Sequence, residues 1–116
     1  MYRQTLKGIT GISCLPEPEK TEPNYAYFPI FVNASMYGFT RDEVYEKLKE
    51  NNIYSRRYFY PLISQFPTYR GLHSARSENL PVAEDVAKKV LCLPLFPDLN
   101  EIQQDYIIDI IKIKRK

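Results

Sequence analysis

The sequence predicts an α+β domain in which helices pack on one face of a small, mostly antiparallel sheet. Short aromatic and β-branched runs of strand length alternate with runs of helical spacing, and several helical runs begin with N-cap residues. The connections are rich in proline, with 9 prolines in 116 residues and no low-complexity tract. Residues 1–116 are sufficient for a single domain of modest size.

The first expected elements are short. Residues 1–7 are typical of the last turns of a helix, which Gly8 would end because glycine tolerates a left-handed C-cap. A helix of this length is marginal by itself, so we expect the chain to begin within a helix of a longer protein. Residues 9–15 predict an edge strand, and the polar, proline-rich residues 16–23 predict a solvated loop.

The clearest predicted strand covers residues 24–33, which are mainly aromatic and β-branched. Pro29 interrupts this run. Because proline has no N–H to donate, we expect Pro29 at a sheet edge, at a bulge, or where its N–H would point outward. Residues 34–38 are expected to form a turn.

A helix with a well-marked start is predicted at residues 40–50. Thr40 is the expected N-cap, and Glu43 completes a capping box. The Asn51-Asn52 pair predicts a left-handed stop, after which residues 53–60 are expected to return as a strand. The helix is expected to bury Val44, Tyr45 and Leu48 and to expose Glu46, Lys47, Lys49 and Glu50.

The C-terminal third predicts a loop, a helix, a strand and a last helix. Residues 70–79 form the loop, and their histidine, His73, is expected to be exposed rather than catalytic. Residues 81–89 start with proline, which suits a first helical position, and residues 90–95 predict a buried strand. Asn100 is expected to cap the last helix in a box with Gln103, and its apolar residues at helical spacing are Ile102, Tyr106, Ile110 and Ile113. The basic residues 112–116 are expected to be its frayed end.

Composition narrows the class of protein. A net charge of +2 predicts no strong field for nucleic acid or membrane, so neither partner is expected. Cys14 and Cys92 lack paired metal-ligand spacing, which favours two free thiols in a reducing cytoplasm. The sequence contains no signal segment, no membrane-spanning run, no glycine-rich phosphate loop and no metal motif. Its motifs therefore predict no metal site and no self-contained active site.

The densest stretch is residues 56–69, where two arginines precede three consecutive aromatic residues and Pro61. As a strand, neither of its faces would be cleanly apolar. Arginine can pair with phosphate or carboxylate, and tyrosine adds a hydroxyl and a flat ring, a combination that suits an anionic ligand containing a ring. The alternatives are a strand end with snorkelling arginines, a surface for a partner subunit, or a stand-alone module that binds an anionic ring compound or single-stranded nucleic acid through Arg56 to Tyr60.

Four motifs occur in a specific order along the chain: Arg-Tyr-Phe-Tyr-Pro-Leu at 57–62, Phe-Pro-Thr-Tyr at 66–69, Leu-Pro-Val-Ala-Glu at 80–84, and Leu-Cys-Leu-Pro-Leu-Phe-Pro-Asp-Leu at 91–99. This order resembles the C-terminal region of the DegT/DnrJ/EryC1/StrS aminotransferases, over nearly the whole chain. Members of that family are pyridoxal-phosphate enzymes that aminate keto sugars attached to nucleotides.

The resemblance implies the small C-terminal domain of a type I-fold transferase. The large N-terminal domain, with the cofactor and its Schiff-base lysine, would then be missing from residues 1–116. No lysine here lies in that context, so we expect no catalytic residue in this chain and no pyridoxal 5'-phosphate bound to it alone. The intact enzyme is expected to be a cytoplasmic homodimer that acts on a nucleotide sugar in polysaccharide or deoxyamino-sugar biosynthesis.

Within that family, the Arg-aromatic-Pro-Leu segment lies near the sugar pocket. The resemblance therefore implies that Arg57, Tyr58, Tyr60 and Pro61 bind substrate. Many members have histidine after the Pro-Leu pair, whereas Ile63 stands here, which removes a polar group from the implied pocket. The Tyr-Pro-Leu-Ile variant is similar to members that act on deoxythymidine-diphosphate 6-deoxy-keto-hexoses.

Overall fold

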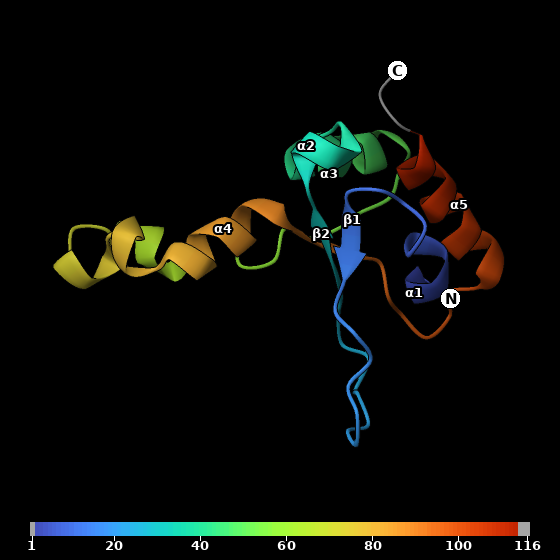
Figure 1. The fold of residues 1–116 in the computed structure, drawn as a ribbon, viewed down its shortest axis with the longest axis horizontal. Helices are drawn as coiled ribbons and strands as arrows, with labels where there is room; N and C mark the ends of the chain where they lie inside the picture. The colour runs from blue at the N-terminus through green and yellow to red at the C-terminus, as the bar shows by residue number, and fades with distance from the viewer. Residues whose placement is uncertain (1, 114–116) are drawn as a thin grey trace.

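The computed structural model describes residues 2–113, and the last three residues of the basic tail, 114–116, lie outside the described part. At its centre three strands form an antiparallel sheet in the order β1-β2-β3 (Figure 1). These strands are β1 (Ile12–Cys14), β2 (Phe28–Val32) and β3 (Val90–Leu93). Ile12 pairs with Val32, and Ile30 pairs with Leu91, so their side chains share one face of the sheet.

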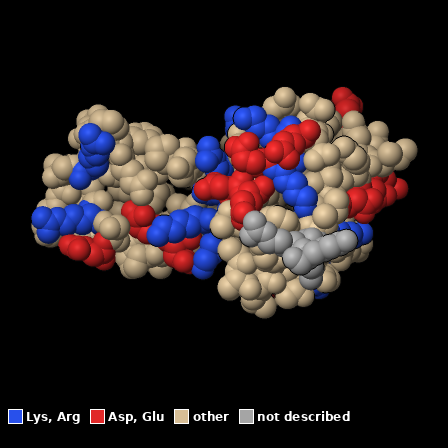
Figure 2. Space-filling model, turned by 90° about the horizontal axis from the view of Figure 1, so that it is seen from above, with Lys and Arg blue, Asp and Glu red and all other residues tan. Residues whose placement is uncertain are grey.

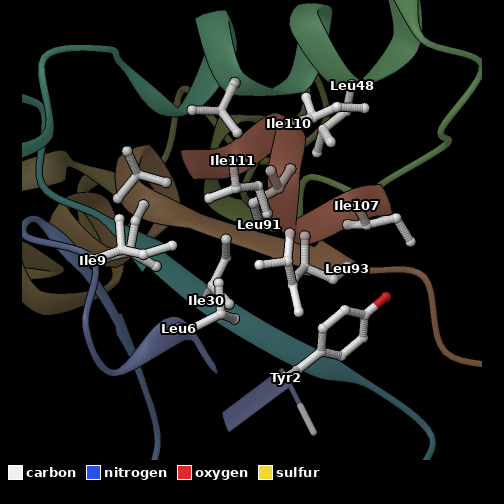
Figure 3. Close-up of a cluster of buried hydrophobic side chains, with 14 of the residues drawn as sticks. Tyr2, Leu6, Ile9, Ile30, Leu48, Leu91, Leu93, Ile107, Ile110 and Ile111 are labelled. Atoms are coloured by element: carbon white, nitrogen blue, oxygen red, sulfur yellow. The ribbon is translucent and has the colours of Figure 1, made fainter. Parts of the chain in front are cut away.

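Three helices cover this face and close the core: α1 (Tyr2–Leu6), α3 (Arg41–Glu50) and α5 (Glu101–Lys112). Figure 3 shows the labelled strand residues Ile30, Leu91 and Leu93 beneath Leu48 of α3 and the isoleucines of α5. Ile30, Leu48 and Leu91 are fully buried. The predicted class, with helices on one face of a small antiparallel sheet, is confirmed.

Helix α3 begins as predicted. The Glu43 N–H donates to Thr40 Oγ1 at 3.1 Å, and the Thr40 N–H donates to Glu43 Oε2 at 2.7 Å, which completes the capping box. Val44 and Leu48 are buried, and Asn52 has the expected left-handed φ of 60°. Glu46, Lys49 and Glu50 are exposed as expected, whereas Lys47 is only half-exposed. Its ammonium lies 4.9 Å from the Phe39 ring centroid, and partial burial lowers its pKa.

Pro29 lies in the central strand. It pairs with Cys92, whose backbone N–H and C=O are hydrogen-bonded to Arg56 on the other side of β3. The nitrogen of Pro29 therefore points toward β1, which has already ended at Cys14, the partner of Ile30. Proline is tolerated because no ladder hydrogen bond is required there, which is the third of the expected alternatives.

Two expected elements take other forms. Residues 34–38 contain a short helix, α2 (Ala34–Tyr37), which ends at Gly38 with a left-handed φ of 99°. Of the four strands predicted from the sequence, the one at residues 53–60 does not form. Arg56 alone makes an isolated bridge to Cys92, and the positive φ of 47° at Phe59 turns the chain away from β3.

Helix α5 has the predicted capping box between Asn100 and Gln103, but its buried stripe differs from the expected one. Of the expected apolar positions only Ile110 is buried, whereas Ile102 is 81% exposed. The C-terminal half of α5 contacts α1 and α3, and its first turn does not enter the core. The buried residues are therefore Ile107, Ile108, Ile110 and Ile111.

A long arm, residues 61–89, extends away from the sheet (Figure 1). It contains single 3-10 turns at η1 (Ile63–Gln65), η2 (His73–Ala75) and η3 (Ser77–Asn79), followed by α4 (Pro81–Lys89) as predicted. His73 is exposed, as expected. No residue of the arm is buried, so the arm has no core of its own in this chain.

Alkaline pH should unfold the domain through two buried tyrosines. Tyr2 donates its hydroxyl to the Pro94 carbonyl and Tyr37 to that of Ile111, and burial raises the pKa of each to about 12. Because this exceeds the unfolded value of 10.0, the stabilisation is complete below pH 10 and is lost as the pH rises to about 12. Each tyrosine should lower the unfolding free energy by up to roughly 1.4 kcal/mol per pH unit there, measurable by urea denaturation.

The double variant Tyr2→Phe/Tyr37→Phe is the control, since it cannot ionise at these positions. It should be less stable at neutral pH but should lack the steep alkaline loss. Lys47, whose pKa is lowered, acts in the opposite direction as the pH rises toward its unfolded value. If the unfolding free energy of the double variant fell equally steeply at alkaline pH, the loss of stability could not be assigned to Tyr2 and Tyr37.

Candidate functional site

The candidate site is an open hollow of about 340 Å³ beside the start of α3. Residues 55–60 form most of its lining, and two tyrosines distant in sequence, Tyr27 and Tyr45, complete it. Three of the four residues implied by the family resemblance, Arg57, Tyr58 and Tyr60, line this hollow. Pro61 is exposed and is not part of its lining.

Arg57 lies between two aromatic rings. Its guanidinium carbon is 4.8 Å from the ring centroid of Tyr45 and 4.4 Å from that of Tyr60, within cation–π distance. One of its nitrogens is 3.5 Å from the carboxylate of Asp42. The side chain remains about one-third exposed. A planar cation is thus held in a defined orientation and is open to solvent on one side.

Tyr58 belongs to an aromatic wall. Its ring meets Tyr27 edge-on, with centroids 5.4 Å apart, and lies 4.1 Å from the ring of Phe59. Tyr27 precedes β2 and was expected only as part of a strand. No local sequence signal relates Tyr27 to Tyr58, because their contact depends on how the chain segments pack.

Arg41 is a further arginine beside the hollow that the sequence did not indicate. It is only 3% exposed, and its guanidinium carbon is 5.3 Å from the Tyr60 ring centroid. An arginine in the first turn of a helix ordinarily faces solvent, so neither its residue type nor its position indicates burial. Its hydrogen-bond partners are the Asp42 carboxylate and the backbone carbonyls of Ala87 and Val90.

The backbone of Arg56 holds this stretch against the sheet. The N–H and C=O of Arg56 exchange hydrogen bonds of 3.0 and 2.7 Å with Cys92 of β3. Burial raises the pKa of the Cys92 thiol, although the charge of Arg56 acts in the opposite direction. A buried thiol with a raised pKa is a poor nucleophile, so Cys92 contributes packing here.

The described lysines lie outside the candidate hollow at residues 55–60. Lys47 donates to the Ile113 carbonyl at 2.6 Å, Lys89 pairs with Asp85, and Lys112 pairs with Asp109. Nor do residues 2–113 contain a cluster of His, Cys, Asp and Glu side chains that could hold a metal ion.

Two other surface properties bear on binding. Figure 2 shows basic and acidic side chains interspersed over the face seen there, with no continuous basic stripe for a nucleic acid. A larger hollow of about 630 Å³ lies between the end of α3 and the start of α5, but none of the implied substrate residues lines it. Within the described part of the chain, no helix is long and apolar enough to span a membrane.

The chain matches an aminotransferase family in sequence and in fold. The model of the DegT/DnrJ/EryC1/StrS aminotransferase family matches residues 1–112, and the chain belongs to this family. It is 51% identical to a dTDP-4-amino-4,6-dideoxy-D-glucose transaminase of Escherichia coli over 97% of the chain. Identity to the transaminase of the same name from Shigella dysenteriae is 40% over 96% of the chain. The chain spans about 29% of the length of these two relatives.

Solved structures of family members have the same fold. The structure of DesI in the presence of its TDP-sugar product gives a TM-score of 0.86 at 27% identity and covers 96% of this chain and 28% of that one. DesV of S. venezuelae in complex with a ketimine intermediate gives a TM-score of 0.79 at 28% identity with the same coverage. These comparisons do not support the alternative of a stand-alone binding module.

The stacking of Arg57 should contribute measurably to stability. Arg57→Ala removes both cation–π contacts and the ion pair with Asp42, so the unfolding free energy should fall by about 1 kcal/mol. Arg57→Lys should recover only part of this loss, because an ammonium lacks the planar face that stacks between two rings. Urea denaturation at neutral pH measures both changes. Equal stability of Arg57→Ala and the unmodified chain would show that the contacts have no net effect.

Proposed function

We propose that this chain is the small C-terminal domain of a pyridoxal-phosphate-dependent aminotransferase that transfers an amino group to a nucleotide-linked keto sugar. The observation that carries the proposal is the family match over residues 1–112 together with 29% coverage of the relatives' length. The missing part would be a large N-terminal domain that contains the cofactor and its lysine. Residues 1–116 would then be one domain of that enzyme.

The hollow at residues 55–60 would form part of the wall of the substrate pocket. A nucleotide sugar contains phosphates and rings, and Arg57 offers a guanidinium open on one side while Tyr58 and Tyr60 offer aromatic faces. Pro61 would shape the backbone next to them. The named relatives are transaminases of dTDP-linked sugars, which is consistent with a nucleotide sugar as substrate.

The chemistry would be divided between the two domains. Pyridoxal phosphate, when bound in the intact enzyme, acts as the electron sink for transfer of the amino group. The residues of this chain would bind and orient the substrate: Arg57 would attract the phosphates, and the tyrosines would hold a ring and limit access of water. No residue of this chain would exchange protons with the reacting carbon.

The arm, residues 61–89, is the surface that would contact the large domain. None of its residues is buried in this chain, and the apolar side chains of Ile63, Phe66 and Leu72 are exposed. A run of exposed apolar side chains of this extent is typical of a surface that another element covers.

The intact enzyme would be a homodimer. Its location would be the cytoplasm, which agrees with the free Cys14 and Cys92.

A chimeric enzyme tests the proposed function. The C-terminal segment of the E. coli relative, which is 51% identical to this chain, can be replaced by residues 1–116. We expect the chimera to catalyse the reaction of that relative, amino transfer between dTDP-4-amino-4,6-dideoxy-D-glucose and the corresponding dTDP-linked keto sugar. Arg57→Ala in the chimera should raise KM by about tenfold, because one charge-assisted contact to phosphate is lost. Lys49→Ala, an exposed cation on α3 outside the hollow, is the matched control and should leave KM unchanged.

A correctly folded, cofactor-loaded chimera without transaminase activity would contradict the proposed function. The genomic sequence upstream of the Met1 codon tests the domain assignment separately. A reading frame that continues upstream through a further large domain with a cofactor lysine is expected, and a stop codon directly before Met1 would argue for a repurposed small domain.

The assignment of the arm can be tested with a variant that leaves the core intact. Ile63→Ser/Phe66→Ser should change the unfolding free energy of this chain by less than about 0.5 kcal/mol, because both side chains are exposed. The same change should abolish binding to the purified N-terminal remainder of the E. coli relative, measured by calorimetry. Ile102→Ser, at an exposed isoleucine of α5, is the control and should bind normally. Equal binding by both variants would place the domain contact elsewhere.

A further inference from the structure

A buried arginine lies behind the candidate site. Arg41, at the start of α3, is 3% exposed, and burying a guanidinium is costly unless its donors are paired. Its Nε donates to Asp42 Oδ1 at 2.8 Å. Its Nη1 donates to the carbonyl oxygens of Ala87 at 2.7 Å and Val90 at 2.9 Å. One side chain thus connects the start of α3 with the junction between α4 and β3.

The carbonyl of Ala87 explains one part of this contact. It belongs to the last turn of α4, where carbonyls lack intrahelical partners and the helix dipole is negative. A cation that donates there satisfies the helix end and fixes the root of the arm, residues 61–89, to α3. This part of the role of Arg41 is structural.

The second part of the contact reaches the candidate site. The Tyr60 ring is within cation–π distance of both Arg41, at 5.3 Å, and Arg57, at 4.4 Å. Asp42 Oδ1 accepts from Arg41 at 2.8 Å and lies 3.5 Å from Arg57. The two arginines therefore share both an aromatic ring and a carboxylate, so the position of one affects the position of the other.

We propose that Arg41 is a positioning residue. It holds the Tyr60 ring and the Arg57 guanidinium in fixed positions relative to the root of the arm, where α4 meets β3. The proposal rests on the proposed function, in which Arg57 and Tyr60 contact substrate. Arginine suits this role because its planar fork donates in several fixed directions at once, toward Asp42 and toward the two carbonyls. Lysine would keep the charge but could not reproduce this fork.

The test uses NMR spectra of carbon-13-labelled tyrosine rings. It compares Arg41→Lys and Arg41→Met with the unmodified 116-residue chain. The Tyr60 resonance is assigned with Tyr60→Phe, and Tyr106 on α5, remote from Arg41, is the internal control. Both variants should shift the Tyr60 ring resonance and leave that of Tyr106 in place. They should also weaken binding of thymidine diphosphate by about tenfold, the loss expected when one oriented contact is disturbed.

A role limited to capping α4 predicts a lower melting temperature with unchanged Tyr60 resonance and unchanged affinity, and that result would overturn the proposal. If Arg41→Met does not fold, the comparison of Arg41→Lys with the unmodified chain decides whether Arg41 positions Tyr60. If the unmodified chain does not bind thymidine diphosphate, the substrate assignment loses its support, whereas the Tyr60 resonance still decides whether Arg41 positions the ring. The two failures are therefore distinguishable.

Discussion

Burial of one face of the sheet beneath α1, α3 and α5 is the constraint on which the rest of the structure depends. Ile30 and Leu91 pair across the two strands that share the longest ladder, and both are fully buried under the helices. Apolar burial is the dominant favourable term for a domain of this size. Because this core is closed by residues of the chain itself, it can hold the hollow and the root of the arm without help from another domain.

The candidate site uses this scaffold at its edge. The backbone pairing of Arg56 with Cys92 anchors the stretch on β3, and the start of α3 supplies Arg41, Asp42 and Tyr45 from the other side. The guanidinium of Arg57 is oriented before any ligand arrives, which reduces the entropy that binding must overcome. The arm is different, because none of its residues is buried and Arg41 attaches it to the domain at its root.

Much of the fold could be predicted from the sequence, and less of the site. Both capping boxes, the helix at 81–89, the edge strand and the core strands were recognised, because each depends on residues a few positions apart. The expected strand at 53–60 failed because strand composition cannot show that Phe59 turns the chain. In the candidate site, motif order predicted Arg57, Tyr58 and Tyr60, which line one hollow, but it did not predict Tyr27 or the burial of Arg41. The contact of Tyr27 with Tyr58, and the hydrogen bonds of Arg41 to Ala87 and Val90, join residues more than 30 positions apart.

The sequence by itself determined where helices start and stop, which runs can pair as strands, and the family to which the chain belongs. These properties arise from local backbone chemistry and from motif order, which neighbouring residues express without reference to the rest of the chain. The tertiary structure alone decided which isoleucines of α5 enter the core, that Arg41 is buried and Lys47 half-buried, and which rings enclose Arg57. Burial and cation–π contacts depend on the packing of distant segments, and packing can override the solvent preference of a single residue.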